Sequence, residues 1–155
     1  MLEKKEFLTT IERQAAHYFS KGYNCCQSVL LAANDLWELN LDQGIIAAGR
    51  FFQHGMGCGS ICGALIGAQM VLGILDNRYE TKLSNKYARK LSEEFNQTFS
   101  STQCSELRKK QSIMDKIGYK GCQRITFMTA GVFYEFWESV NGNQTPGVSR
   151  YSDVK

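Results

Sequence analysis

The sequence predicts an all-α protein, a compact single-domain bundle of about six or seven helices. Only one proline, Pro146, occurs in 155 residues, and proline is the residue that interrupts helices most strongly. Apolar residues recur at spacings of three and four, as on the buried face of a helix. A chain of this length, 43% hydrophobic and 21% charged, can bury one core and is short for two. We therefore expect a single helical domain over residues 1–140.

The first two helices are indicated by an apolar face and by a capping signal. Residues 5–20 carry apolar side chains three and four positions apart, and Gly22 should end this helix. Asn24 can cap the next helix while Gln27 returns a hydrogen bond to it, a variant of the capping box. The pattern predicts a second helix over residues 24–37.

The middle of the chain alternates apolar and glycine-rich segments. Residues 42–52 form a shorter apolar segment that predicts a third helix. Glycines alternate through residues 53–60, and they favour a tight loop over a helix. Ser60 can cap an apolar helix that ends near Leu75. A polar helix with one apolar face should follow over residues 80–99.

The last third of the chain predicts one short helix and one long helix. The short helix should contain Cys104, Leu107 and Ile113, because serine and threonine residues that favour helix starts precede it. Residues 122–140 are rich in aromatic residues and predict the final helix. Residues 141–155 are rich in Gly, Asn and Ser, and we expect a flexible tail there.

Charge and hydropathy exclude several classes of protein. The net charge is only +3 and no long basic run is present, which argues against a nucleic-acid partner. The N-terminal residues mix charges from the third position, so no secretory signal is expected. The longest apolar run, residues 61–75, is shorter than the ~20 residues of a membrane span. The sequence predicts a soluble, cytoplasmic protein without membrane insertion.

Six cysteines are the main indication of function. In a reducing compartment their expected uses are metal binding or redox chemistry. Most fall in the first turn of a predicted helix, where the unpaired amides and the helix dipole stabilise a thiolate and lower its pKa. Thiolates that share one site need such a field or a cation between them. The six residues are Cys25, Cys26, Cys58, Cys62, Cys104 and Cys122.

Simpler interpretations of these residues remain open. A free cysteine often acts as a small buried hydrophobe, and this is the preferred interpretation of Cys26. Cys58 and Cys62 are four positions apart and could supply two ligands, but no zinc-ribbon Cys-x-x-Cys or zinc-finger histidine accompanies them. His17 and His54 are expected to be ordinary surface or hydrogen-bonded histidines.

The cysteine pattern resembles the C_GCAxxG_C_C family of redox-active proteins. The matching motifs are Gly22-Tyr23-Asn24-Cys25, Cys62-Gly63-Ala64-Leu65-Ile66-Gly67, and the single residues Cys104 and Cys122. The resemblance covers nearly the whole chain, and it implies an all-helical protein in which four cysteines act together. Carried over by position, the implied ligands are Cys25, Cys62, Cys104 and Cys122.

The resemblance also implies a cofactor. A similar cysteine-bearing domain in split-Soret cytochromes is associated with an iron-sulfur cluster. The chain departs from the family name at Ile61-Cys62-Gly63-Ala64, where the name reads Gly-Cys-Ala. Cys62 is preferred as the equivalent thiol, since Cys-Gly-Ala-x-x-Gly is intact after it. Cys58 and Cys26 stay as alternate ligands.

Four functional hypotheses follow. The first is an iron-sulfur protein, with a cluster of the [2Fe-2S] type, that passes electrons to a redox partner protein or a small redox substrate. The second is a metal-free thiol-disulfide oxidoreductase in which Cys25 attacks and Cys62 resolves. The third is a structural zinc or soft-metal module, and the fourth a bundle with inert thiols. A homodimer is compatible with all four.

The small residues after Cys62 have two interpretations. Gly63, Ala64 and Gly67 form a face on which side chains are minimal. Such a face allows the close approach of either a cofactor or the backbone of another helix. Both interpretations stay open from the sequence, and the first makes these three residues cofactor-binding.

Overall fold

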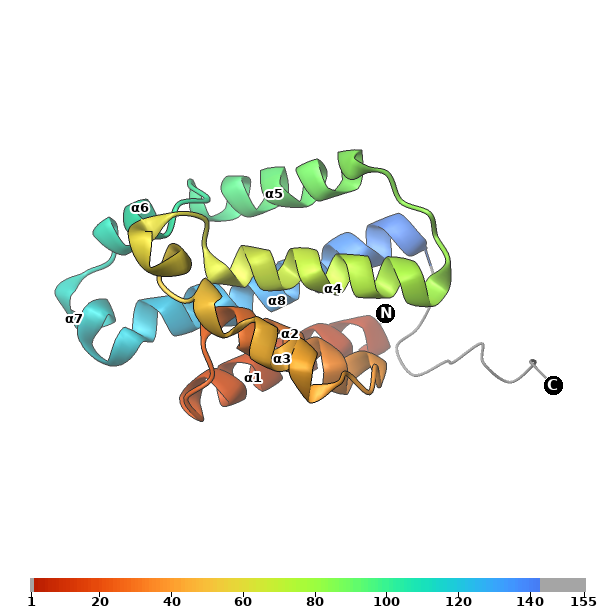
Figure 1. Cartoon of the computed structure of the whole chain (residues 1–155), viewed down its shortest axis with the longest axis horizontal. Coiled ribbons are helices and arrows are strands. Elements are labelled where there is room, and N and C mark those ends of the chain that lie inside the picture. Colours follow the sequence, from red (N-terminus) through yellow and green to blue (C-terminus); the bar gives the residue numbers. More distant parts are fainter. Residues whose placement is uncertain (1, 143–155) are drawn as a thin grey trace.

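The computed structural model describes residues 2–142, and they form an all-α bundle as the sequence predicts (Figure 1). Within this range no β-strand forms, and a single antiparallel bridge pairs Ile61 with Gln103. The predicted tail lies, from residue 143 onward, outside the described residues. The helices are α1 (Leu2–Ser20), α2 (Cys25–Trp37), α3 (Gln43–Ala48), α4 (Gly63–Tyr79), α5 (Asn85–Phe99), α6 (Cys104–Lys109), α7 (Ile113–Lys116) and α8 (Lys120–Asn141).

Three further helical segments are short and irregular. η1 (Arg50–Phe52) and η3 (Ile117–Tyr119) are single 3₁₀ turns, and η2 (Gly55–Gly59) is a wide turn between α3 and α4. Within the described part of the chain, none of the helices is long and apolar enough to cross a membrane.

The core lies around α8, which packs against α1, α2, α4 and α5. In Figure 1 it runs behind α4, with α1 and α2 beneath. The Trp37 and Phe133 rings meet edge to face with their centres 6.0 Å apart, and the Tyr79 and Trp137 rings lie tilted against each other at 5.9 Å. Burying each large side chain contributes about 1.5–3 kcal/mol. The largest fully buried side chains are Trp37, Trp137, Tyr134, Phe95, Phe133 and Phe136.

The predicted capping box at the start of α2 is confirmed. The Gln27 backbone N–H donates to Asn24 Oδ1 at 2.9 Å, and the Asn24 N–H donates to Gln27 Oε1 at 3.3 Å. The Asn24 amide also donates to the carbonyls of Gly49 at 3.1 Å and Arg50 at 2.8 Å. One buried asparagine therefore fixes both the start of α2 and the segment that leads into η1.

The predicted cap of the fourth helix, α4, was wrong. α4 begins at Gly63 with Cys62 in the N-cap position, and Ser60 does not cap it. The Ser60 carbonyl accepts from the Cys104 N–H at 2.7 Å, and the Cys62 N–H donates to the Thr102 carbonyl at 2.8 Å. Pairing with the segment between α5 and α6 thus holds this stretch extended and delays the helix.

Other boundaries differ from the prediction for local reasons. The helix predicted from residue 80 begins at Asn85, because the Asp76 carboxylate accepts from Thr81 at 2.6 Å and from the Leu83 N–H at 2.9 Å and so closes a turn. The single helix predicted over 42–52 is divided at Gly49 into α3 and η1.

The prediction that one short helix holds both Cys104 and Ile113 was also wrong. α6 ends at Lys109 and contains Cys104. Ile113 starts the separate helix α7, whose cap is Ser112: its hydroxyl accepts from the Asp115 N–H at 3.1 Å. The last helix starts two residues earlier than predicted, at Lys120.

Candidate functional site

Four of the six cysteines line one cavity of about 510 Å³. Cys25 is the first residue of α2, Cys62 is the N-cap of α4, Cys104 is the first residue of α6, and Cys122 is the third residue of α8. Figure 1 shows the starts of these helices gathered at one end of the bundle. Segments nearly a hundred positions apart in the chain therefore present their thiols to the same space.

Backbone hydrogen bonds bring Cys62 and Cys104 together. The reciprocal bonds between residues 60–62 and 102–104 place the first residue of α6 beside the N-cap of α4. A Cβ at Gly55 would lie 2.9 Å from the Cys104 Cβ, so the η2 turn packs directly on Cys104. Because Gly55 has a φ of +59°, this position favours glycine on two grounds.

Gly63 makes room for the Cys25 thiol. A Cβ at Gly63 would collide with Cys25 Sγ and would lie 2.6 Å from the Phe52 carbonyl oxygen. A Cβ at Gly67 would lie 2.7 Å from the Cys26 carbonyl oxygen. Neither glycine nor Ala64 is among the residues that line the cavity. Gly63 and Gly67 therefore allow α4 to pack closely against α2 and η1.

The two remaining cysteines lie away from the cavity. Cys26 is fully buried, and its thiol lies 3.8 Å from the Met70 sulfur, between α2 and α4. Cys58 is exposed on the η2 turn and donates to the Gly55 carbonyl at 3.3 Å. Of the two thiols that compete for the family position, Cys62 reaches the cavity and Cys58 does not.

The thiols of the cavity are close enough to influence one another's ionisation. The pKa of Cys25 is raised by the neighbouring Cys62 and Cys122, and that of Cys62 by Cys104 and Cys122. Cys104 in turn responds to Cys122. A negative charge on one sulfur thus opposes a charge on the next, as expected for groups that share one site.

Burial sets the direction of these pKa values, contrary to the expectation from helix dipoles. It raises the pKa of Cys62 to about 11, although the N–H groups of Ala64 and Leu65 act in the opposite direction. Burial raises the pKa of Cys25 still further, and raises that of Cys104, where Arg108 partly offsets it. The helix ends alone do not make these cysteines reactive thiolates at neutral pH, and a bound cation would.

The arrangement of the thiols bears on whether they could hold a single metal ion or a centre of several metal atoms. Within residues 2–142, no three His, Cys, Asp or Glu side chains are arranged to hold a single metal ion. A tetrahedral zinc ion needs all its sulfur ligands about 2.3 Å from one point. A centre of several metal atoms divides its ligands among those atoms, so four thiols that line one cavity need not all meet at one point.

Several polar residues of the cavity were not anticipated from the sequence. His54, Arg108, Tyr119 and Lys120 also line it, whereas the sequence favours an ordinary surface or hydrogen-bonded histidine at position 54. Arg108 lies one helical turn after Cys104, a spacing that the sequence displays. The position of His54 depends on its left-handed backbone conformation, with a φ of +54°. No sequence pattern predicts this conformation.

The fold and the site define a class of protein: a small helical bundle in which four cysteines from distant segments line one cavity. The chain belongs to the C_GCAxxG_C_C family, described as "Putative redox-active protein (C_GCAxxG_C_C)", which matches residues 23–136. This confirms the family resemblance of the cysteine motifs. No curated protein and no solved structure matched the chain.

Proposed function

We propose that this protein is an electron carrier in which Cys25, Cys62, Cys104 and Cys122 hold an iron-sulfur cluster. The observation that carries the proposal is that these four thiols line the same cavity of about 510 Å³. Membership of a redox-active family supports the redox part. The partner would be a redox protein or a small redox substrate.

The donor set suits the cluster chemically. Four cysteine thiolates are the usual ligands of both [2Fe-2S] and [4Fe-4S] clusters. We keep the two-iron type as the expectation from the sequence. When bound, the cluster would supply single-electron chemistry, and its iron would hold the four sulfurs as thiolates despite the raised pKa of Cys25, Cys62 and Cys104.

The remaining residues of the site would position and shield the ligands. Asn24 fixes the start of α2 and with it Cys25, and Gly63 leaves space for the Cys25 sulfur. Only 7% of Cys62 is exposed, so solvent has little access to that ligand. Arg108 and Lys120 line the same cavity, and their positive charges would offset the negative charge of the thiolates.

The alternatives receive less support. A metal-free thiol-disulfide enzyme needs an attacking thiol with a lowered pKa, and burial raises the pKa of both Cys25 and Cys62. A structural zinc site needs three or four ligands around one point, an arrangement not found among the described residues.

The test is anaerobic purification of the full chain, followed by a visible absorption spectrum and analysis of iron and sulfide. We expect a brown protein with comparable iron and sulfide. In Cys62→Ser we expect most of the iron to be lost while the far-ultraviolet circular dichroism stays unchanged, because no core-sized side chain is removed. Cys58→Ser is the matched control and should retain full iron, since Cys58 lies outside the cavity.

Two results would contradict the proposal. One is a colourless protein without iron or sulfide after expression with both supplied. The other is an equal iron content in Cys62→Ser and Cys58→Ser, which would remove the cavity from cofactor binding. A colourless protein that carries zinc would instead favour the structural-metal alternative.

A further inference from the structure

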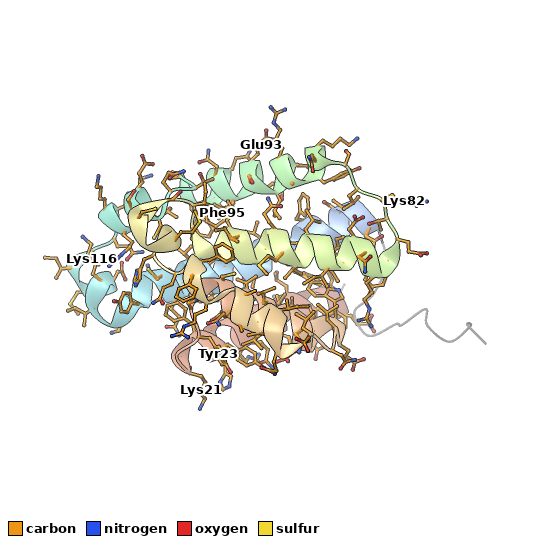
Figure 2. All side chains as sticks on the ribbon, viewed as in Figure 1. Lys21, Tyr23, Lys82, Glu93, Phe95 and Lys116 are labelled. Atoms are coloured by element: carbon orange, nitrogen blue, oxygen red, sulfur yellow. The ribbon has the colours of Figure 1, made fainter. Side chains whose placement is uncertain are left out.

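A second cavity of about 400 Å³ adjoins the cysteine site. His54, Cys104 and Arg108 line both cavities, so they form the wall between them. The second cavity lies among the η2 turn, α6 and the end of α7. Figure 2 shows Lys116, the last residue of α7, at the outer edge of the bundle. Its other lining residues are Gly57, Gly59, Ser105, Lys109 and Lys116.

The second cavity has a one-sided charge. Arg108, Lys109 and Lys116 line it together with His54, and no acidic residue lines either cavity, although the chain contains 15. Within residues 2–142, no salt bridge involves Arg108, Lys109 or Lys116. These cations come from α6 and α7 and converge on one hollow without a counter-charge among the described residues.

The carboxylates on the same two helices are engaged elsewhere. Glu106 Oε2 accepts from the Ser101 hydroxyl at 2.6 Å. Asp115 Oδ1 accepts from Arg124 Nη2 at 2.7 Å, and their ion pair holds the Asp115 pKa below its usual range. Neither side chain is therefore placed to neutralise the cavity.

Arg108 is oriented by its neighbours before any ligand binds. Its Nη1 lies 3.3 Å from His54 Nδ1, and its guanidinium lies 5.8 Å from the centre of the Tyr119 ring. The His54 and Tyr119 rings are themselves 5.7 Å apart. A fixed guanidinium binds oxyanions better than a free one, because less side-chain entropy is lost on binding.

The glycine-rich η2 turn, which lines one side of the second cavity, packs closely against α6. A Cβ at Gly59 would lie 2.8 Å from the Ser105 Cβ, and Gly59 has a φ of +73°. Glycine at this position thus allows the turn to approach the first residues of α6. Ser105 and Cys104 line the same cavity as the three cations.

We propose that the second cavity binds a small molecule bearing an oxyanion group, such as a phosphate, a sulfur oxyanion or a carboxylate, beside Cys104. Only the role of this site rests on the proposed function: it would bring an anionic substrate next to the redox site. Binding of the anion itself requires no cluster.

The two histidines of the chain provide a direct test. His54 lines the cavity, whereas His17 lies on α1 beside Tyr18 and lines neither cavity. The full chain as purified is titrated at fixed pH with phosphate, sulfate or acetate, and with potassium chloride at matched ionic strength. We expect saturable shifts of the His54 ring signals in nuclear magnetic resonance with at least one oxyanion, and no saturable shift of His17. Calorimetry on the same samples gives the affinity.

Adjacent lysines supply a matched pair of variants. Lys109 lines the cavity, whereas the Lys110 amine donates to the Ser100 carbonyl at 3.2 Å and lines neither cavity. Lys109→Gln should weaken anion binding about three- to fivefold and Lys110→Gln less than about twofold. Arg108→Gln should weaken binding by about tenfold or more, because a charge-assisted hydrogen bond is lost.

Two outcomes would overturn the anion site: a His54 shift that follows potassium chloride without saturation, or equal losses in Lys109→Gln and Lys110→Gln. Iron and sulfide are measured on the same samples. A colourless protein that still binds phosphate would contradict the iron-sulfur proposal alone. A brown protein without saturable binding would contradict the anion site alone.

Discussion

The two ends of the bundle are built on different principles. Toward one end, α1, α2 and α8 bury large aromatic side chains such as Trp37 and Trp137. At the other end, the cysteines lie among glycines, left-handed residues and short helices. The exposed large hydrophobic residues of the described chain also lie on the segments around the cysteine end: Tyr23, Phe51, Met56, Ile113, Met114, Ile117 and Tyr119.

The difference shows that the large aromatic side chains of the core and the cysteine cavity occupy separate parts of this fold. The aromatic end buries the apolar area that drives folding. At the cysteine end, backbone hydrogen bonds join distant segments, such as those of Cys62 with Thr102 and Cys104 with Ser60. That construction leaves hollow space beside the thiols, which a tightly packed core would have filled.

The largest expected effect tests the aromatic end. Phe133→Ala should lower the free energy of unfolding by about 3–5 kcal/mol, because Phe133 is 1% exposed and packs on Trp37. Ile113→Ala should change it by about 0.5 kcal/mol or less, since Ile113 is 80% exposed on α7. Urea unfolding measures both. Similar losses in the two variants would show that both ends contribute equally to stability.

A smaller effect is expected at the cysteine end, where α4 begins. Gly63→Ala should destabilise the protein by about 1–3 kcal/mol, because the new methyl group would meet Cys25 Sγ and the Phe52 carbonyl. Gly73→Ala, further along the same helix, should be neutral or stabilise by up to about 1 kcal/mol, because no atom lies within 4 Å of its Cβ. If both variants unfold at the same urea concentration, the close approach at Gly63 is not a constraint.

The sequence was sufficient for features that depend on local chemistry. The capping box of Asn24 and Gln27 reproduces a short-range pattern, and the structure contains it. The family motif favours Cys62 over Cys58 as the equivalent thiol, and the structure places Cys62, not Cys58, on the cavity. Both features are carried by residues within a few positions of one another.

Features that depend on contacts between distant segments could not be predicted. Ser60 has the side chain of a good helix cap, but its backbone pairs with residues 102–104. The helix dipole at Cys62 was expected to lower the thiol pKa, but burial in the assembled bundle outweighs it. In each case a local preference was real and a tertiary contact opposed it.

The smallest expected effect concerns Cys26, where the effect of a buried thiol on stability can be measured apart from any effect on a cofactor. Its pKa is raised from 9.0 to about 12, mainly by burial. Because the pKa of Cys26 is higher in the folded than in the unfolded state, the unfolded state releases the thiol proton at a lower pH. The contribution of the neutral thiol to the free energy of unfolding is therefore complete below the unfolded-state pKa of about 9. It is lost as the pH rises from about 9 toward 12. Between pH 8 and pH 10 the wild-type protein should therefore lose about 1 kcal/mol more stability than Cys26→Ala.

Urea unfolding at the two pH values measures this difference. Cys26 lies outside the cavity, so iron content should not change in the variant. Parallel pH dependences in wild type and Cys26→Ala would show that the buried thiol does not control alkaline stability. A loss of iron in Cys26→Ala would place this residue with the ligands and move the boundary between the two ends into α2.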